Sequence, residues 1–342
     1  MHTIVIAGAG GFIGGALVHT LARLHPDTTI RAVDKKPLPE WHRLPHLPNT
    51  ECLCLDLAQP DACHIATRNA TEVYNLAADM GGMGYISNYR IACMRNVLIN
   101  TNLIEAAYRA GASTYFFASS ACVYNTALQA DPNAVALKES DAYPALAERG
   151  YGWEKLYAEM LCQEYYHERG LRTYIARFHN IYGPYGTWRG GREKAPAALC
   201  RKALAVLHGD ADHVPIWGDG TQERSYTYID DCITGILKIV ACPALIATPV
   251  NLGSDELISV NGLLDIIEAI AQPPQPFARR YEPAQPTGVQ RRNSDNTFIR
   301  ATLDWAPGAP IAEGLSPTYT WIAKQYNQAG QAGGPNADGN PP

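Results

Sequence analysis

The sequence has little of what marks several classes of protein. Its 342 residues carry 28 Lys and Arg against 33 Asp and Glu, and the net charge of -5 argues against non-specific binding to nucleic acid or to an anionic membrane. Its nine cysteines include no Cys-x-x-Cys pair, which argues against a zinc site or a disulfide framework. We therefore expect reduced thiols, no metal, and a cytoplasmic location.

Charge is also absent from residues 3–22, which contain no Asp, Glu, Lys or Arg. An export signal would begin with a basic segment, and a membrane helix would rarely contain the five glycines found here. A strand, a tight turn and a helix explain this stretch better, so we expect no membrane segment.

Short apolar runs alternate with longer helical patterns through the first half of the sequence. The predicted strands are residues 3–7, 30–34, 51–55, 72–76, 114–119 and 172–177. The predicted helices are residues 12–24, 89–110 and 152–169, with Gly170 in the place of a C-terminal cap. This alternation predicts right-handed βαβ units and an α/β fold with a doubly wound parallel sheet of the Rossmann type.

The regularity weakens after about residue 178, where Gly and Pro become frequent. We predict a nucleotide-binding Rossmann domain of residues 1–177 and about 218–252. A smaller α/β substrate-binding lobe is predicted for about 178–217 and 253–327. Residues 328–342 are rich in Gly, Pro and Asn, and we expect them to form a disordered tail.

A glycine-rich turn follows the first predicted strand. Gly8, Gly11 and Gly14 form a GxxGxxG pattern, which lets the backbone approach a pyrophosphate at the N-terminus of the following helix. Asp34 ends the second strand, where its carboxylate can bind ribose hydroxyls and would repel a 2′-phosphate. The turn therefore predicts NAD as cofactor, in preference to NADP, although Lys35 could soften that preference. Asp56, after the third strand, fits either the adenine side of this site or a plain helix cap.

Tyr151 and Lys155 lie four residues apart at the start of a predicted helix, and so on one face of it. An ammonium close to a phenol lowers the pKa of the phenol, which could then accept a proton from a sugar hydroxyl. Ser120 ends a strand upstream, and the three residues resemble the Ser–Tyr–Lys triad of short-chain dehydrogenases.

Longer stretches resemble the GDP-mannose 3,5-epimerases, a family of extended short-chain dehydrogenases, along nearly the whole chain except its tail. The matching stretches are AADMGGMG (77–84), SSACVY (119–124), LKESDAYPA (137–145), RFHNIYGPYGTWRGGREKAPAA (177–198), WGDG (217–220) and RNSDN (292–296). Residues 85–102 depart from the family pattern, and residues 288–291 read Gly-Val-Gln-Arg where the family has Arg followed by Gly.

The resemblance implies an NAD-dependent enzyme that converts GDP-D-mannose to GDP-L-galactose through a transient 4-keto sugar, with GDP-L-gulose as a 5-epimer product. Tyr151 would be the base at the 4-hydroxyl, assisted by Ser120. Cys122 and Lys194 would be the base and the acid that invert carbons 3 and 5. From the residues alone, Cys122 is better explained as a buried packing thiol. A 4,6-dehydratase would need an acid where Ala121 stands.

The resemblance also supplies the remaining site residues. The candidate cofactor-binding residues are Gly8, Gly11, Phe12, Ile13, Gly14, Asp34, Asp56, Leu57, Ala77 and Lys155. The candidate substrate-binding residues are Gly81, Ser120, Ala121, Cys122, Tyr151, Asn180, Glu193, Lys194, Ala195, Lys202, Gln222, Arg224 and Arg292. A homodimer is expected from the family, with apolar positions in residues 96–107 and 156–165 available for a four-helix bundle, although packing within one chain would give the same apolar pattern. The alternatives are an epimerase of another GDP-hexose, a nucleotide-sugar 4-epimerase, or a non-catalytic NAD-binding sensor.

Overall fold

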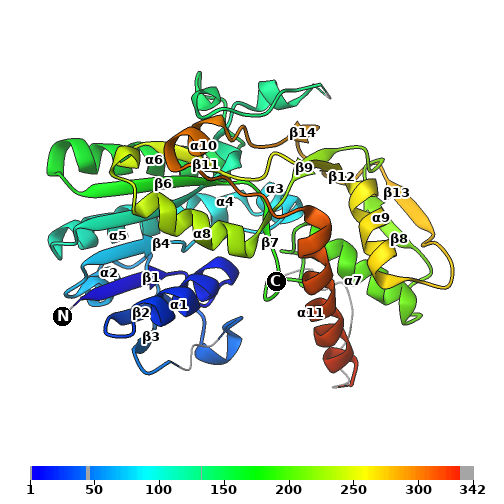
Figure 1. Cartoon of the computed structure of the whole chain (residues 1–342), viewed down its shortest axis with the longest axis horizontal. Coiled ribbons are helices and arrows are strands. Elements are labelled where there is room, and N and C mark those ends of the chain that lie inside the picture. Colours follow the sequence, from blue (N-terminus) through cyan, green and yellow to red (C-terminus); the bar gives the residue numbers. More distant parts are fainter. Residues whose placement is uncertain (1, 44–46, 132, 332–342) are drawn as a thin grey trace.

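The computed structural model describes residues 2–43, 47–131 and 133–331, and this part of the chain forms a large α/β unit with a smaller unit beside it (Figure 1). In the described residues the large unit contains a seven-stranded parallel sheet in the order β11-β6-β5-β4-β1-β2-β3. Its strands are β1 (Thr3–Ala7), β2 (Thr29–Asp34), β3 (Thr50–Cys54), β4 (Glu72–Asn75), β5 (Thr114–Ser120), β6 (Arg172–Phe178) and β11 (Pro249–Leu252). The chain proceeds outward in one direction from β1 and in the other from β4, and ligands bind outside the carboxyl ends of strands at such a reversal.

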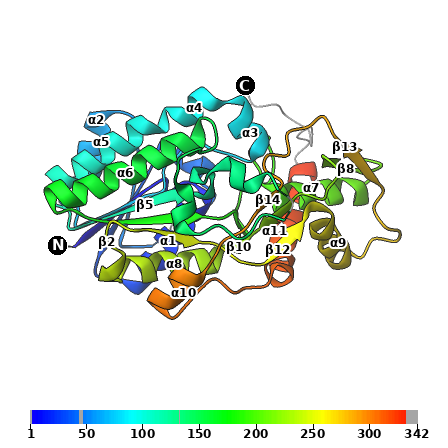
Figure 2. The same cartoon turned by 90° about the horizontal axis from the view of Figure 1, so that it is seen from above.

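Helices cover both faces of the sheet, so the doubly wound fold predicted from the sequence is confirmed (Figure 2). One face carries α1 (Phe12–Leu24), α8 (Ile229–Val240) and α10 (Thr297–Leu303). The other carries α2 (Pro60–Thr67), α5 (Asn96–Arg109) and α6 (Tyr151–Arg169). Successive residues of β1 alternate between two apolar cores: Ile4 and Ile6 join one, and Val5 and Ala7 join the other.

The predicted strands agree with β1 to β6 within a residue or two at each end, and the predicted helix 12–24 is α1. Gly170 ends α6 in the left-handed conformation at φ 72°, as a glycine cap does. The predicted helix 89–110 is divided: α4 (Arg90–Met94) and α5 meet at Arg95, and the separate α3 (Met83–Asn88) precedes them. The strand β11 was missing from the prediction.

The smaller unit consists of three helices and short strand pairs. Its helices are α7 (Ala195–Leu207), α9 (Val260–Ala271) and α11 (Ile311–Gln331), which pack around Leu199, Leu264 and Leu315. The strand groups are β8 (Val214–Trp217) with β13 (Arg279–Glu282), and β12 (Leu257–Ser259) with β9 (Glu223–Ser225) and β14 (Arg291–Arg292). β7 (Ile181–Tyr182) pairs with β10 (Thr227–Tyr228) beside the large sheet.

Short 3-10 helices complete the described elements: η1 (Leu38–Glu40), η2 (Ala121–Val123), η3 (Thr126–Gln129), η4 (Glu139–Ala142) and η5 (Pro243–Leu245). The helix α11 continues to Gln331, so the first four residues of the predicted tail are helical, and residues 332–342 lie outside the described residues. The predicted boundaries between the two units stay a prediction.

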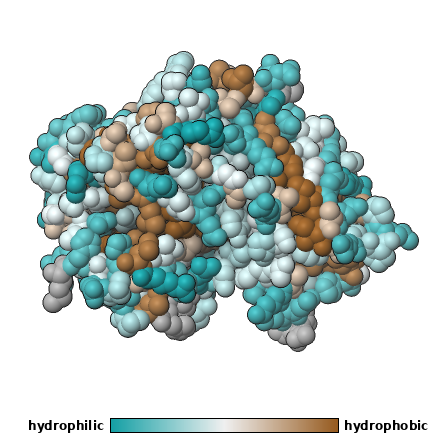
Figure 3. Space-filling model, viewed as in Figure 1, coloured by the Kyte–Doolittle hydropathy of each residue, from teal (hydrophilic) through white to brown (hydrophobic). Residues whose placement is uncertain are grey.

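The surface seen in Figure 3 mixes hydrophilic and hydrophobic side chains, with a hydrophobic strip over β12 and α9. Within the described ranges, every helix is too short or too polar to span a lipid bilayer.

Candidate active site

A cavity of about 560 Å³ is lined by residues of both units. Ser120 and Tyr151 come from the carboxyl edge of the large sheet, and Lys202 and Trp217 from the smaller unit. All of the residues predicted to bind substrate line this one cavity, from Gly81 in the loop after β4 to Arg292 in β14. The structure therefore brings the whole predicted set together, while the role of each residue stays a prediction.

The Ser–Tyr–Lys group lies where β5 and α6 meet. Ser120 is the last residue of β5, and its hydroxyl accepts a hydrogen bond from the Cys122 N–H at 3.2 Å and caps η2. Tyr151 is the first residue of α6 and interacts with the Ser120 hydroxyl. The Lys155 Nζ lies 5.6 Å from the centre of the Tyr151 ring and donates to the Ala118 carbonyl at 3.1 Å. Lys155 is buried and is not one of the residues that line the cavity.

The electrostatics of this group differ from the expectation that Lys155 lowers the pKa of Tyr151. Burial raises the pKa of Tyr151, and the hydrogen bond with Ser120 is the opposing influence. Burial also lowers the pKa of Lys155, which weakens its ability to stabilise a phenolate. In this arrangement the hydrogen bond with Ser120 acts to lower the pKa of Tyr151.

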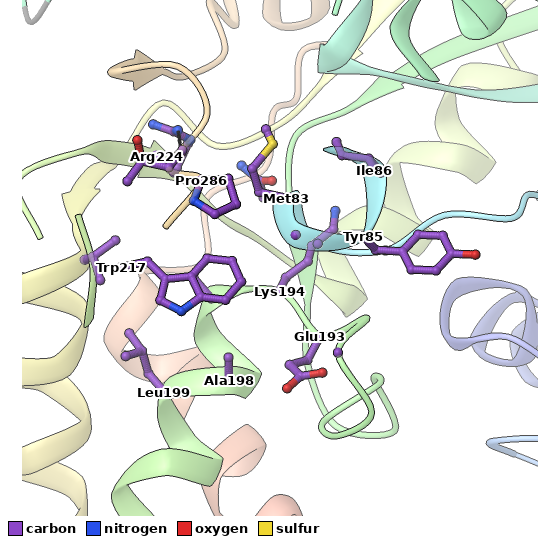
Figure 4. Close-up of a pocket in the computed structure, with 18 of the residues that line it drawn as sticks. Met83, Tyr85, Ile86, Glu193, Lys194, Ala198, Leu199, Trp217, Arg224 and Pro286 are labelled. Carbon is purple, nitrogen blue, oxygen red and sulfur yellow. Dashed lines mark hydrogen bonds between the residues drawn. The ribbon is translucent and has the colours of Figure 1, made fainter. Parts of the chain in front are cut away.

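Cys122 and Lys194 reach the cavity from different elements. Cys122 lies in η2 with 8% of its surface exposed, and Lys194 is the N-cap residue of α7. Figure 4 shows the side chains of Lys194 and Glu193 leaving the chain in opposite directions, with Lys194 directed toward the α3 segment. The two predicted proton carriers thus share one cavity, and neither sits in an apolar core away from it.

Of this pair, one pKa is shifted away from neutral pH and the other toward it. Burial raises the pKa of the Cys122 thiol to about 12, helped by Glu148 and opposed by Arg292. Burial, with the charge of Arg292, lowers the pKa of Lys194. The lysine therefore moves toward the neutral range that proton exchange favours, whereas the thiol moves away from it.

Several basic residues of the cavity are engaged with the protein backbone. The two terminal nitrogens of Arg224 make four hydrogen bonds, to the carbonyl oxygens of Glu223, Thr287, Val289 and Gln290. Lys202 donates to the Pro215 carbonyl at 2.8 Å and lies 5.8 Å from the Trp217 ring centre. These contacts hold the loops of the smaller unit, and the predicted contacts of Arg224 and Lys202 with a diphosphate stay predictions.

Three of the remaining predicted residues are also tied to nearby groups. Asn180 donates to the Ser225 carbonyl at 3.0 Å, and Gln222 donates to the Trp217 carbonyl at 2.8 Å. Glu193 accepts a hydrogen bond from Arg201 at 3.0 Å.

A clamp between two loops of the cavity was not predicted from the sequence. Arg192 donates to Asp79 at 2.7 Å, and its guanidinium lies 3.9 Å from the centre of the Tyr85 ring. Tyr85 also donates to Asp79 at 2.8 Å. Although burial opposes the shift, hydrogen bonds from Tyr85 and Arg192 lower the pKa of Asp79. The Gly82 N–H donates to the Arg192 carbonyl at 2.9 Å, so the Gly81 loop and the Lys194 loop are fixed to each other.

Glu148 is a second residue of the cavity wall that the sequence analysis missed. It contacts Cys122 and lies 3.6 Å from Arg292. The segment just before α6 has no hydrophobic period, so its sequence gave no signal of a site.

The glycine-rich turn has the geometry that a dinucleotide needs. A Cβ on Gly14 would lie 2.1 Å from the Gly8 carbonyl oxygen, and Gly8 has φ 82°, so neither position accepts a side chain without strain. The N-cap of α1, Gly11, has no side-chain cap, and its first turn has no acidic residue, which leaves its N–H groups open to an anion. Phe12 and Ile13 begin this helix.

The other predicted cofactor residues lie along the same edge of the sheet. Asp34 is fixed by hydrogen bonds from the Gly10 and Lys36 N–H groups, each at 3.0 Å. Ala77 follows β4, and Leu57 is buried after β3. Asp56 is exposed and accepts from the Ala58 N–H at 3.1 Å, and it does not cap α2, whose N-cap residue is Gln59. These residues fit NAD, and no group of three potential metal ligands occurs in the described part of the chain.

The comparisons with known proteins define the class. Residues 4–253 match the NAD dependent epimerase/dehydratase family, and the chain belongs to this family. It is an NAD-dependent epimerase of nucleotide sugars.

Individual relatives show how similar the chain is to particular enzymes. The chain is 42% identical to GDP-mannose 3,5-epimerase 1 of Oryza sativa subsp. indica over 331 residues, covering 95% of this chain and 82% of that protein. An epimerase of Methanothermobacter thermautotrophicus has the same fold, with a TM-score of 0.83 at 22% identity, covering 97% of this chain and 95% of that one. MoeE5 in complex with UDP-glucose and NAD has a TM-score of 0.77 at 26% identity, covering 95% and 99%.

Proposed function

We propose that this enzyme inverts carbons 3 and 5 of GDP-D-mannose to give GDP-L-galactose, with GDP-L-gulose as the product of inversion at carbon 5 alone. One observation carries the proposal: Cys122 and Lys194, from separate elements, line the cavity that also contains Ser120 and Tyr151. A simple 4-epimerase has no use for such a pair, because it exchanges no proton at neighbouring carbons. The likeness to the rice enzyme over 95% of the chain supports the same substrate.

The chain's residues have distinct parts in this reaction. NAD, when bound, supplies reversible acceptance of hydride from carbon 4. Tyr151, assisted by Ser120, takes the proton of the 4-hydroxyl and later returns it. Because the carbonyl at carbon 4 acidifies the hydrogens on carbons 3 and 5, Cys122 can remove a proton there while Lys194 delivers one to the opposite face. Arg292 and Lys202 add positive charge to a cavity that receives an anionic diphosphate.

Deuterium incorporation tests the proposal directly. Purified enzyme is incubated with GDP-D-mannose in deuterated water, and the recovered sugars are examined by NMR and mass spectrometry. We expect deuterium at both carbon 3 and carbon 5. A Cys122→Ala variant should lose it, and a Cys54→Ala variant, altered at an exposed thiol of β3, should retain it. Products inverted only at carbon 4, or turnover only with another GDP-hexose, would replace the proposal with those reactions.

The proposed enzyme is a cytoplasmic homodimer. The described cysteines are all free, which suits a reducing compartment. The helices α4 to α6 lie together in Figure 2 and leave large apolar side chains exposed. These side chains are Ile91, Met94, Leu98, Tyr108, Trp153, Tyr157 and Met160. Two copies packing through these helices would cover them in a four-helix bundle.

Sedimentation equilibrium checks the dimer. The wild type should sediment at twice the chain mass, and Leu98→Glu, which places a charge in this face, should shift it toward the monomer. A wild-type enzyme that is monomeric at micromolar concentration would contradict the dimer without touching the proposed reaction.

A further inference from the structure

A carboxylate faces the Cys122 thiol inside the cavity. Glu148 belongs to the irregular segment before α6, and its backbone N–H donates to the Cys122 carbonyl at 2.9 Å. The approach is close: a Cβ on Gly152 would lie 2.2 Å from the same carbonyl oxygen. The backbone therefore holds residues 122 and 148 beside each other, and their side chains interact directly.

Arg292 supplies one positive charge to both groups. Its Nη1 lies 3.7 Å from the Cys122 sulfur, and its Nη2 lies 3.6 Å from a Glu148 carboxylate oxygen. The side chain of Gln129 accepts a hydrogen bond from the Arg292 Nε and fixes the guanidinium. That Glu148 oxygen and that Arg292 nitrogen are buried and, within the described residues, make no hydrogen bond. The three side chains therefore form a group with capacity to hold a proton.

The reaction needs such a proton holder. A thiol with a pKa of about 12 is ionised in only about one molecule in 10⁵ at pH 7, whereas a base at carbon must be thiolate. After the sulfur has taken a proton from one carbon, it must lose that proton before it can act at the second carbon. A single thiol that serves two carbons must therefore be deprotonated again within the cavity.

We infer, resting on the proposed function, that Glu148 is the group that regenerates the Cys122 thiolate. The S–H bond breaks, an O–H bond forms on the Glu148 carboxylate, and the electron pair stays on sulfur. Arg292 balances the single negative charge on whichever of the two groups carries it. No electron is transferred and the total charge of the three groups does not change. The Glu148 side chain is 16% exposed, and it passes the proton on to water.

The surrounding charges belong to the same cavity. The ionisable or charged groups that act on Cys122 are Ser120, Glu148, Tyr151, Lys155, Lys194, Arg224 and Arg292. Those that act on Glu148 are Cys122, Arg224 and Arg292. Transfer of the thiol proton to the Glu148 carboxylate leaves the number of protons on the pair unchanged, so this route to the thiolate does not depend on pH. Without that carboxylate the thiolate forms only by release to solvent, and its fraction rises tenfold per pH unit below the pKa of the thiol.

Alkylation of Cys122 measures the thiolate without any substrate. The NAD-loaded enzyme is treated with iodoacetamide from about pH 6 to about pH 9, and modification of residue 122 is followed by peptide mass spectrometry. We expect the rate to rise by less than about tenfold per pH unit for the wild type and for Glu164→Gln, which removes an exposed carboxylate of α6. Glu148→Gln should rise about tenfold per pH unit, and Glu148→Asp should return the shallower profile. Parallel profiles for the wild type and Glu148→Gln overturn the inference.

Turnover with GDP-D-mannose in deuterated water gives a second, independent readout. Near pH 7, Glu148→Gln should incorporate about tenfold less deuterium at the second inverted carbon than at the first. The first thiolate can form by release to solvent before the sugar fills the cavity, whereas the second must be regenerated with the sugar in place. Equal loss at both carbons would show that Glu148 only supports the shape of the site. If the alkylation profiles differ as expected but the wild type exchanges neither carbon, the carboxylate–thiol pairing stands and the proposed function fails.

Discussion

The parallel sheet and the cavity wall are held together in different ways. Successive βα units form the sheet, which is stabilised by strand pairing and by an apolar core on each face. The cavity wall joins segments that are distant in the chain, and single polar side chains such as Arg224 and Arg192 tie their backbones together. The sheet therefore supplies stability and the wall supplies chemistry, and substitutions should separate the two.

The largest effect should come from Tyr151→Phe. Losing the phenol removes the proposed proton acceptor at the 4-hydroxyl, and kcat should fall by about 10²- to 10⁴-fold. The ring still fills its place at the start of α6, so the unfolding midpoint should change little. Turnover and thermal unfolding are measured on the same preparations, with Tyr157→Phe, partly exposed on the same helix, as the control. A loss smaller than tenfold would assign the proton transfer to another group.

A substitution in the large unit should show the opposite behaviour. Arg177 in β6 makes a buried bidentate ion pair with Glu159, with N–O distances of 2.9 and 2.7 Å. Arg177→Met leaves that carboxylate buried without its partner, which should reduce the free energy of unfolding by about 3–5 kcal/mol. Urea unfolding measures this, and Arg172→Met, exposed at the start of the same strand, should cost far less. If Arg177→Met instead lowered kcat and left the free energy of unfolding unchanged, the assignment of stability to the sheet and of chemistry to the cavity wall would be wrong.

Acid should reveal a buried histidine at the junction of the two units. Burial lowers the pKa of His179 to about 3, and its Nε2 pairs with the Asn251 side chain at 2.9 Å. Below the ordinary histidine pKa of about 6.5, His179 binds a proton in the unfolded chain but stays neutral in the folded chain. Stability should therefore fall as pH falls from about 6.5 toward 3, by about 1.4 kcal/mol per pH unit from this residue.

Unfolding at pH 6.5 and pH 5 compares this slope in the wild type and in His179→Gln. The variant keeps a hydrogen-bonding side chain but has no titrating ring, so its stability should change by about 2 kcal/mol less across this interval. Identical slopes in the two proteins would rule out a buried neutral histidine.

The smallest effect should follow loosening of the cavity wall. Arg224→Met removes four hydrogen bonds to backbone carbonyls and frees the loop at residues 287–290. We expect KM for the nucleotide sugar to rise about tenfold with kcat nearly unchanged, a cost of about 1.4 kcal/mol in binding. Steady-state kinetics test this beside Arg280→Met, an exposed arginine of β13. A fall in kcat with KM unchanged would place Arg224 in the chemistry instead.

The sequence predicted the sheet well because strands buried on both faces read as continuous apolar runs. The strand β11 was not predicted because it has only four residues, one of which is Pro249 and another the buried polar Asn251. The helix predicted for residues 89–110 is divided at Arg95, and it begins only at Arg90, since Tyr89 is non-helical where its ring stacks on Tyr85 at 4.8 Å. Such tertiary contacts leave no periodic trace in the sequence.

The location of Tyr151 and Cys122 in the cavity was predictable, because a local motif and the family resemblance pointed to these residues, while their roles stay predictions. The site was not predictable where partners meet only after folding. Asp79 and Arg192 are 113 positions apart in the chain, and Cys122 and Arg292 are 170 apart. Spacing reports nothing about such pairs, so Glu148, whose partners are of this kind, needed the structure.

Lys194 caps the N-terminus of α7, where its carbonyl accepts from the Ala198 N–H at 2.9 Å. The helix α7 in turn packs against α9 and α11, so the position of the Lys194 amine depends on the position of the smaller unit. If that unit rotates away from the sheet, Lys194, the proposed proton donor, must move with it, and ligand release would then be coupled to loss of the proposed acid.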